Sequence, residues 1–361
     1  MYFASDNSGP ASPAVMTALI KANEGYRMGY GADTEMEEVR ARIRAEFEAP
    51  DAAVYLVTTG TAANALALAT LGQSWQTVFC TAPAHIQQDE CNAPEFFTGG
   101  AKLTLVSPNA KMTTKELRSA IEAEGTRGVH GPQRGPVSIT QVTEHGTVYS
   151  LNELQALSSV AKEYNLPVHL DGARFANALV ALGCTPAEMT WKSGIDAVSF
   201  GGTKNGLMGV EAVIFFDPKH AWEFELRRKR GAHLLSKHRF LSAQMLAYLT
   251  DDLWRENARS ANAHATTLAT GLKQCGVELA YPQEANLVFP RMSRRIHNAL
   301  LDAGAVYHLW GGSLEGPSDE VITARCVCRL VHFKGGGPVL SRTAQTRDNR
   351  LMHKTRRSEL I

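Results

Sequence analysis

The amino-acid sequence predicts an α/β fold, with a mostly parallel sheet in a large domain and a small C-terminal α+β domain. From residue 53 to Phe216, short apolar segments alternate with helices of ten or more residues, which is the pattern of right-handed βαβ units. Past Gly276 the segments become shorter, as in a smaller α+β domain. A chain of 361 residues, 44% of them hydrophobic, is long enough for both.

Local patterns predict each element in turn. A helix is expected over 13–23, where apolar residues recur at helical spacing, and another over 34–48 behind the capping residue Asp33. Glycines and tyrosines predict a loop between them. The further strands are expected at 53–57, 77–80, 101–106, 135–141, 212–216, 277–279, 286–289 and 321–325, and before Asp171 and Gly201. The further helices are expected at 61–71, 114–123, 151–164 and within 221–273.

These elements predict a large domain over residues 1–245 and a small domain over 246–328. A basic tail follows over 329–361, with eight Lys or Arg against two Asp or Glu. The tail lacks the amphipathic period of a helix that docks on a domain, so we expect it to be disordered.

Composition and charge limit the classes of function. A net charge of +1 gives no electrostatic reason for a nucleic-acid partner. The N-terminus lacks the basic and apolar regions of a signal peptide, and the apolar runs are shorter than a membrane span. We therefore expect a cytoplasmic protein without membrane contact. The six cysteines are scattered and lack the usual zinc spacing, so we expect reduced thiols and no metal site.

Asp171 and Lys204 are the most informative residues of the chain. Each follows a short apolar strand and stands among small residues, so both are expected at one edge of the sheet, where open α/β sheets hold ligands. A carboxylate and an amine placed so are what pyridoxal phosphate needs, since the acid keeps the pyridine nitrogen protonated and the amine forms the Schiff base. The alternatives are a helix cap for Asp171 and a solvated side chain for Lys204.

Three further groups could complete such a site. Thr59, Gly60 and Thr61 lie between a strand and a helix, where backbone N–H groups can bind a phosphate, although the same residues also serve simply as turn and cap. Arg174 could bind a carboxylate or form an ordinary ion pair. His85 could stack on the pyridine ring or accept a proton; a metal site with Asp89, Glu90 and Cys91 is less favoured, because hard and soft donors are mixed.

Several segments, in order, resemble the threonine aldolases, which belong to the aspartate-aminotransferase-like superfamily of pyridoxal phosphate enzymes (fold type I). The resemblance runs from Ser5 to about Cys328. It is carried by Ser5-Asp6, Tyr30-Gly31, the segment 59–64, Ala84-His85 with 89–96, the segments 171–175 and 200–206, and Ser236-Lys237 with 239–243. After Cys328 the chain departs from the family, which continues with a strand and an amphipathic helix; we interpret this as an altered reading frame or a divergent terminus.

The resemblance implies a role for each residue. Lys204 would form the Schiff base, Asp171 would pair with the pyridinium nitrogen, and His85 would stack on the ring. The phosphate would bind at Thr59, Gly60 and Thr61. The substrate carboxylate would be held by Ser5, Arg174 and Arg325, and Arg230 would lie near the site with contributions from a partner subunit.

The implied reaction is retro-aldol cleavage of the Cα–Cβ bond in β-hydroxy-α-amino acids, giving glycine and an aldehyde. Threonine, allo-threonine and phenylserine are all candidate substrates, and His85 or a water that it orients would be the base. The family implies a homodimer or homotetramer with sites between subunits. Two alternatives stay open: another fold type I lyase reaction such as β-elimination, and a catalytically impaired subunit on the same scaffold.

Overall fold

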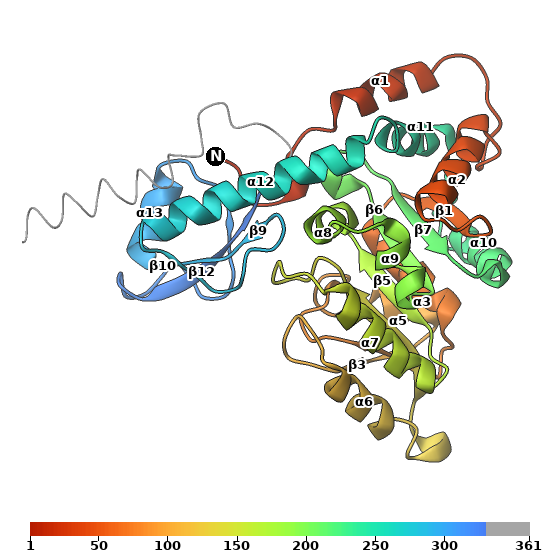
Figure 1. Cartoon of the computed structure of the whole chain (residues 1–361), viewed down its shortest axis with the longest axis horizontal. Coiled ribbons are helices and arrows are strands. Elements are labelled where there is room, and N and C mark those ends of the chain that lie inside the picture. The colour runs from red at the N-terminus through yellow and green to blue at the C-terminus, as the bar shows by residue number, and fades with distance from the viewer. Residues whose placement is uncertain (330–361) are drawn as a thin grey trace, which may run out of the picture. The chain divides into compact units, whose positions relative to one another are not determined.

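The computed structural model describes residues 1–329, so the expected basic tail lies, after Arg329, outside the described residues. The chain forms two compact units (Figure 1). The large unit comprises Pro10–Glu144 and Val148–Glu256; the described part of the small unit comprises Met1–Gly9, His145–Thr147 and 257–329. The expected domain boundary at residue 245 stays a prediction.

Seven strands of the large unit form one sheet in the order β1-β7-β6-β5-β4-β2-β3. Their bounds are β1 Ala53–Val57, β2 Gln76–Cys80, β3 Lys102–Leu105, β4 Gln133–Thr140, β5 Val168–Gly172, β6 Ala197–Gly201 and β7 Glu211–Phe215. All neighbours pair in parallel except at β7, which is antiparallel to both β1 and β6. Every residue of β1, β5, β6 and β7 is buried, as expected of strands covered on both faces. The predicted mostly parallel α/β sheet is therefore confirmed.

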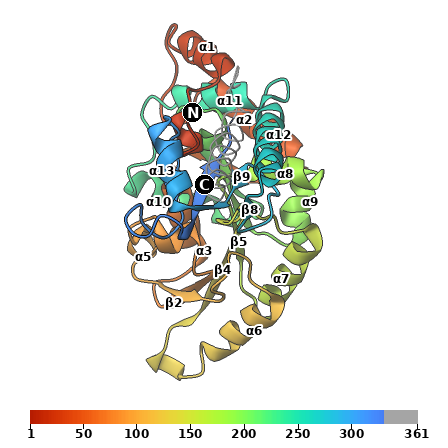
Figure 2. The ribbon, with the colours of Figure 1, turned by 90° about the vertical axis from the view of Figure 1, so that its left-hand side faces the viewer.

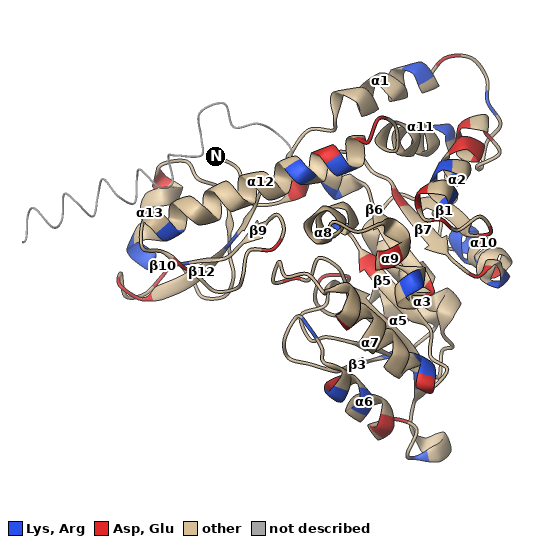
Figure 3. Cartoon of the chain, viewed as in Figure 1, with Lys and Arg blue, Asp and Glu red and all other residues tan. Residues whose placement is uncertain are grey.

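Helices cover both faces of this sheet. Figure 2 shows α3 and α5 on one side and α7, α8 and α9 on the other. The helices of the large unit are α1 Pro13–Ala22, α2 Thr34–Glu46, α3 Gly60–Leu71, α4 His85–Gln88, α5 Ala93–Thr98, α6 Thr114–Ala123, α7 Leu151–Glu163, α8 Phe175–Leu182, α9 Pro186–Met189, α10 Ala221–Arg230 and α11 Arg239–Tyr248. Figure 3 shows α3 without charged residues, whereas α10 carries both signs. This fits α3, which is buried from Ala62 to Thr70.

The expected helical region 221–273 is helical and has two breaks. It consists of α10, α11 and α12 Leu253–Gln274. The first break follows α10, which ends at Arg230; the next residue, Gly231, is its C-cap and donates its N–H to Arg227 O. The second lies at Asp251 and Asp252, both with positive φ (51° and 58°), a conformation that interrupts a right-handed helix.

The small unit is built on a five-stranded antiparallel sheet. Its elements are β8 Glu278–Leu279, β9 Leu287–Val288, β10 Pro290–Ser293, α13 Arg294–Asp302, β11 His308–Leu309 and β12 Val321–Val327. Leu268 and Leu272 of α12 pack with Met292, Leu300 and Cys326 in its core, and Figure 1 shows α12 and α13 beside β10 and β12. Within the described part of the chain, no helix combines the length and the apolar character needed to cross a membrane.

A buried histidine joins the three central strands of the large sheet. His169 on β5 is fully buried; its Nδ1 lies 3.0 Å from Ser138 Oγ on β4 and its Nε2 lies 2.9 Å from Ser199 Oγ on β6. Burial lowers the pKa of His169 to about 4, because the charged imidazolium would be desolvated. The native state therefore holds this side chain neutral.

The depressed pKa of His169 predicts a pH-dependent contribution to stability. Between about pH 6.5 and about pH 4 the unfolded chain binds a proton at this residue and the native state does not, so the free energy of unfolding falls as the pH falls. In urea titrations, the stability advantage of wild type over His169→Gln should shrink by about 2–3 kcal/mol across this range. The exposed His308 supplies the control His308→Gln; an equal difference at both pH values would contradict the prediction.

Candidate active site

The chemically active residues of the large unit gather at one edge of its sheet. The parallel strands β5 and β6 are in register, with Asp171 opposite Ser199, and Lys204 follows the end of β6. Since β7 runs the other way, its first residue Glu211 pairs with both Gly201 of β6 and Val57 of β1. Thr59, which follows β1, therefore shares this edge with Asp171 and Lys204. The structure places these groups as the sequence predicted, at the carboxyl ends of the parallel strands.

Asp171 lies at the centre of a buried hydrogen-bonded group. Its side chain is 2% exposed. Asn64 Nδ2 on α3 donates to Asp171 Oδ2 and to Glu90 Oε1, both at 2.9 Å, and Ala173 N donates to Asp171 Oδ1 at 3.0 Å. The helix α8 after Asp171 begins only at Phe175, with Arg174 at its N-cap. Asp171 is thus a buried carboxylate bonded to neutral donors and not a helix cap.

His85 is joined to the same group through Glu90. His85 Nδ1 lies 2.8 Å from Glu90 Oε1; the Glu90 side chain has no exposed surface, whereas that of His85 is 36% exposed. The hydrogen bond to Glu90 raises the pKa of His85, and burial raises the pKa of Glu90. The hydrogen bond from His85 compensates for the burial of the Glu90 carboxyl group. It involves Nδ1 of His85, so Nε2 is left for further contacts.

Glu144 approaches His85 from the loop after β4. Its Oε1 accepts a hydrogen bond from His85 N at 3.0 Å, and burial raises its pKa to about 7. Near neutral pH, Glu144 is therefore poised between its two protonation states.

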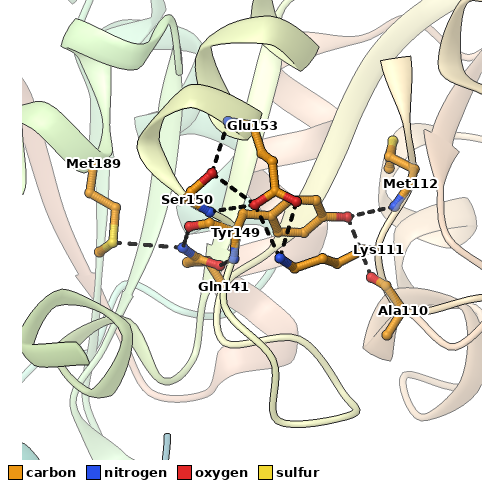
Figure 4. A network of polar contacts seen from close by, with 8 residues as sticks. All are labelled: Ala110, Lys111, Met112, Gln141, Tyr149, Ser150, Glu153 and Met189. Atoms are coloured by element: carbon orange, nitrogen blue, oxygen red, sulfur yellow. Dashed lines mark hydrogen bonds and ion pairs between the residues drawn. The ribbon is translucent and has the colours of Figure 1, made fainter. Parts of the chain in front are cut away.

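A network of polar contacts closes the loop that carries Glu144 (Figure 4). Gln141 Nε2 donates to Tyr149 O at 2.8 Å, and Tyr149 N donates back to Gln141 Oε1 at 2.9 Å. Tyr149 Oη in turn accepts from Met112 N at 2.8 Å. These bonds fix both ends of the segment 141–149, and with it the backbone on which Glu144 sits.

The turn from Thr59 to Thr61 opens helix α3. Thr59 is the N-cap, and its Oγ1 accepts a hydrogen bond from Ala62 N at 3.1 Å, so the capping role weighed from the sequence is real for this residue. A methyl group built on Gly60 would meet no atom within 4 Å. The N-terminus of a 12-residue helix with open space beside it can hold an anion.

Lys204 sits in a short 3₁₀ turn, Thr203–Asn205, directly after β6. Asn205 Nδ2 fixes this turn by donating to Tyr248 Oη at 2.6 Å and to Trp254 O at 2.8 Å. On the other side, Gly202 N donates to Glu211 Oε2 at 2.6 Å. The backbone that carries Lys204 is therefore held firmly, as precise placement of a reactive amine requires.

The other predicted site residues lie in different places. Arg174 directly precedes α8 in the large unit. Arg230 ends α10 and lines a cavity of about 600 Å³ with Phe96 and Arg227. Ser5 and Arg325 belong to the small unit, where Val327 N donates to Phe3 O at 2.8 Å, two residues from each of them. Their roles stay predictions. Among the described residues, no group of three or more His, Cys, Asp or Glu could hold a metal ion.

Two contributors were not selected as site residues from the sequence. Asn64 carries a signal, since it is an amide inside the alanine- and leucine-rich α3, and a buried amide needs partners. Glu90 was considered only as a metal ligand. Its bond to His85 depends on the short helix α4 and the turn after it, which have no periodicity to reveal them.

Comparisons with known proteins identify the family of the chain. The model of the beta-eliminating lyase family matches residues 2–294. The chain is 44% identical to the low specificity L-threonine aldolase of Pseudomonas sp. (strain NCIMB 10558), covering 86% of this chain and 90% of that protein, and 42% identical to that of Pseudomonas aeruginosa, covering 86% and 89%.

Solved structures show the same fold. The Leishmania major threonine aldolase superposes with a TM-score of 0.88 at 26% identity, covering 96% of this chain and 98% of that one. A serine palmitoyltransferase from S. paucimobilis with bound PLP has a TM-score of 0.66 at 18% identity, covering 96% and 86%, which is a likeness of fold alone. These structures confirm the predicted fold type I architecture. The chain therefore belongs to the beta-eliminating lyase family and is a lyase.

Proposed function

We propose that this lyase cleaves L-threonine, L-allo-threonine and related β-hydroxy-α-amino acids such as phenylserine to glycine and an aldehyde, with pyridoxal 5′-phosphate as cofactor. The names of the Pseudomonas relatives support the substrate class. The observation that carries the proposal is the buried Asp171 carboxylate, which accepts hydrogen bonds from the neutral donors Asn64 Nδ2 and Ala173 N.

The residues present fit this cofactor. A buried anion is stabilised by a cation, and a protonated pyridine nitrogen supplies one. The open space at Gly60 leaves room for a phosphate at the N-terminus of α3. Lys204 would hold the cofactor covalently, His85 would lie against the ring, and Thr59, Gly60 and Thr61 would bind the phosphate. When bound, the cofactor supplies an electron sink for the bond that is cleaved.

The residues of the chain would position the substrate and move its proton. Arg174 is proposed to bind the substrate carboxylate, together with Ser5 and Arg325, because a guanidinium forms paired hydrogen bonds with a carboxylate. The Glu90 carboxylate accepts the Nδ1–H of His85, which leaves the lone pair on Nε2. That nitrogen can take the proton of the β-hydroxyl group, directly or through a water.

We also propose a cytoplasmic homodimer or homotetramer with sites that involve a partner subunit. Exposed apolar side chains on α5 and α10 support association: Phe96 is 78% exposed and Leu226 is 52% exposed, both line the same cavity, and exposed apolar surface of this kind is typical of protein interfaces. Arg230 lies in the same region of the large unit.

The proposed reaction is tested by its products. Purified protein supplied with pyridoxal phosphate should form glycine and the matching aldehyde in equal amounts from the L-enantiomers of threonine, allo-threonine and phenylserine, with the D-enantiomers assayed for comparison. The family description favours β-elimination as a second candidate; that reaction would release a keto acid and ammonia instead. Release of these products without glycine would contradict the proposal.

The Glu90–His85 contact predicts a shift in the pH profile. In Glu90→Gln the main cause of the raised His85 pKa is removed, so the acidic limb of kcat/KM for threonine should move to lower pH. Loss of the orienting carboxylate should also lower kcat by about 10–100-fold. Glu153→Gln removes a carboxylate that caps α7 and pairs with Lys111, and it should change neither. An unshifted acidic limb in Glu90→Gln would show that His85 is not the base.

A further inference from the structure

The turn that carries Lys204 rests on a buried carboxylate that the proposed mechanism does not use. Glu211 is the first residue of β7 and only 7% exposed. Gly202 N donates to its Oε2 at 2.6 Å, and the backbone and hydroxyl group of Thr203 are also hydrogen-bonded to it. The carboxylate therefore receives several hydrogen bonds from the two residues that precede Lys204.

The packing of the turn keeps Glu211 in this place. A Cβ on Gly202 would lie 2.6 Å from Val210 O, and one on Gly201 would lie 2.5 Å from Ala173 O, so the backbone approaches its neighbours too closely for a larger residue. Val210 N donates to Thr203 Oγ1 at 3.2 Å, which ties the residue before Glu211 to the same turn. The short loop between β6 and β7 thus fixes the carboxylate beside the lysine.

Glu211 and Lys204 also interact electrostatically. Burial raises the pKa of Glu211, and Lys204 is among the groups that oppose this rise. Tyr248 on α11 interacts electrostatically with Glu211, and His85 on α4 interacts electrostatically with Lys204. A negative charge in a weakly screened environment favours the protonated form of a nearby nitrogen.

We propose that Glu211 is a positioning residue for Lys204: it holds the lysine-bearing turn in place and keeps the lysine nitrogen protonated when that nitrogen is linked to the cofactor. The inference rests on the proposed function, because the linkage is the one proposed for Lys204. A purely structural role would not require the negative charge of Glu211, because a neutral amide oxygen could accept the same hydrogen bond from Gly202. The proposed role does require this charge.

The test is a pH titration of the visible Schiff-base absorption of protein loaded with pyridoxal phosphate. Glu211→Gln keeps the shape and the acceptor oxygen but removes the charge, so the midpoint at which the band loses its proton should fall by about one pH unit. The matched control is Asp196→Asn. Asp196 directly precedes β6, at the end of the strand away from Lys204, and its carboxylate accepts a hydrogen bond from Val168 N at 2.7 Å. Its midpoint should equal that of wild type.

The outcomes separate the possibilities. An unchanged midpoint in Glu211→Gln, with a lowered melting temperature as in Asp196→Asn, would make Glu211 a structural residue only and overturn the inference. If Glu211→Gln does not fold, Glu211→Asp decides, since withdrawing the charge by one methylene should lower the midpoint by a few tenths of a unit; an unchanged midpoint there overturns the inference too. Absence of the band from loaded wild-type protein would instead refute the proposed function.

Discussion

Lys204→Ala is expected to lower the rate of glycine formation from threonine by a factor of about 10⁴ or more, because the amine that would hold the cofactor covalently is lost. The turn around it is fixed by Asn205 and Glu211, so the fold itself sets the position of Lys204. The measurement is kcat for threonine together with the melting temperature, which should change little.

Lys192→Ala provides the control for this prediction. Lys192, like Lys204, lies in a 3₁₀ turn of the large unit, Trp191–Ser193, but it forms a partly exposed ion pair, with Nζ 2.6 Å from Glu48 Oε2. Such pairs contribute little to stability, and kcat should stay at the wild-type value. Retention of more than about a tenth of the wild-type kcat by Lys204→Ala would mean that the lysine is not the residue on which the reaction depends.

Asp171→Asn should lower kcat for threonine by about 10²–10⁴-fold, the range seen when a buried catalytic carboxylate becomes an amide. The amide has nearly the same shape, so Asn64 and Ala173 can still contact the side chain, but the negative charge that would keep the pyridine nitrogen protonated is gone. KM should change much less than kcat, because Asp171 is proposed to act on the cofactor and not to hold the substrate.

Asp196→Asn again serves as the matched control, since it removes a carboxylate bonded to a backbone N–H at the far end of the neighbouring strand. It should retain wild-type kcat. Equal losses of kcat in the two variants would attribute the effect of Asp171→Asn to destabilisation of the sheet and would remove its proposed role.

The sequence predicted the sheet and its active edge because both depend on short-range patterns. Alternating apolar strands and long helices determine that the strands are parallel, and parallel strands bring their carboxyl ends together. Asp171 lies near the carboxyl end of β5 and Lys204 lies in the turn that follows β6, so their placement needed no knowledge of distant contacts. The cap at Asp33 was equally local, with its side chain bonded to Met36 N at 2.9 Å.

Contacts between distant segments were beyond the reach of these patterns. Asn64 bridges Asp171 and Glu90, which are 107 and 26 residues away along the chain, and only the packed α3 brings the three together. The reversed direction of β7 gives Glu211 its place beside the Lys204 turn, yet an apolar strand reads the same in either direction. The breaks after α10 and α11 depend on single residues with special backbone conformations, which helical periodicity does not reveal.

The most direct measurement is borohydride reduction of the protein loaded with pyridoxal phosphate, followed by peptide mapping. Borohydride makes a Schiff base permanent, so the lysine that carries the cofactor becomes labelled. We expect the label on the peptide that contains Lys204, and we expect Lys204→Ala to remain unlabelled. Label on a different lysine, or recovery of an unmodified Lys204 peptide from fully loaded protein, would contradict the assignment of this edge of the sheet as the active site.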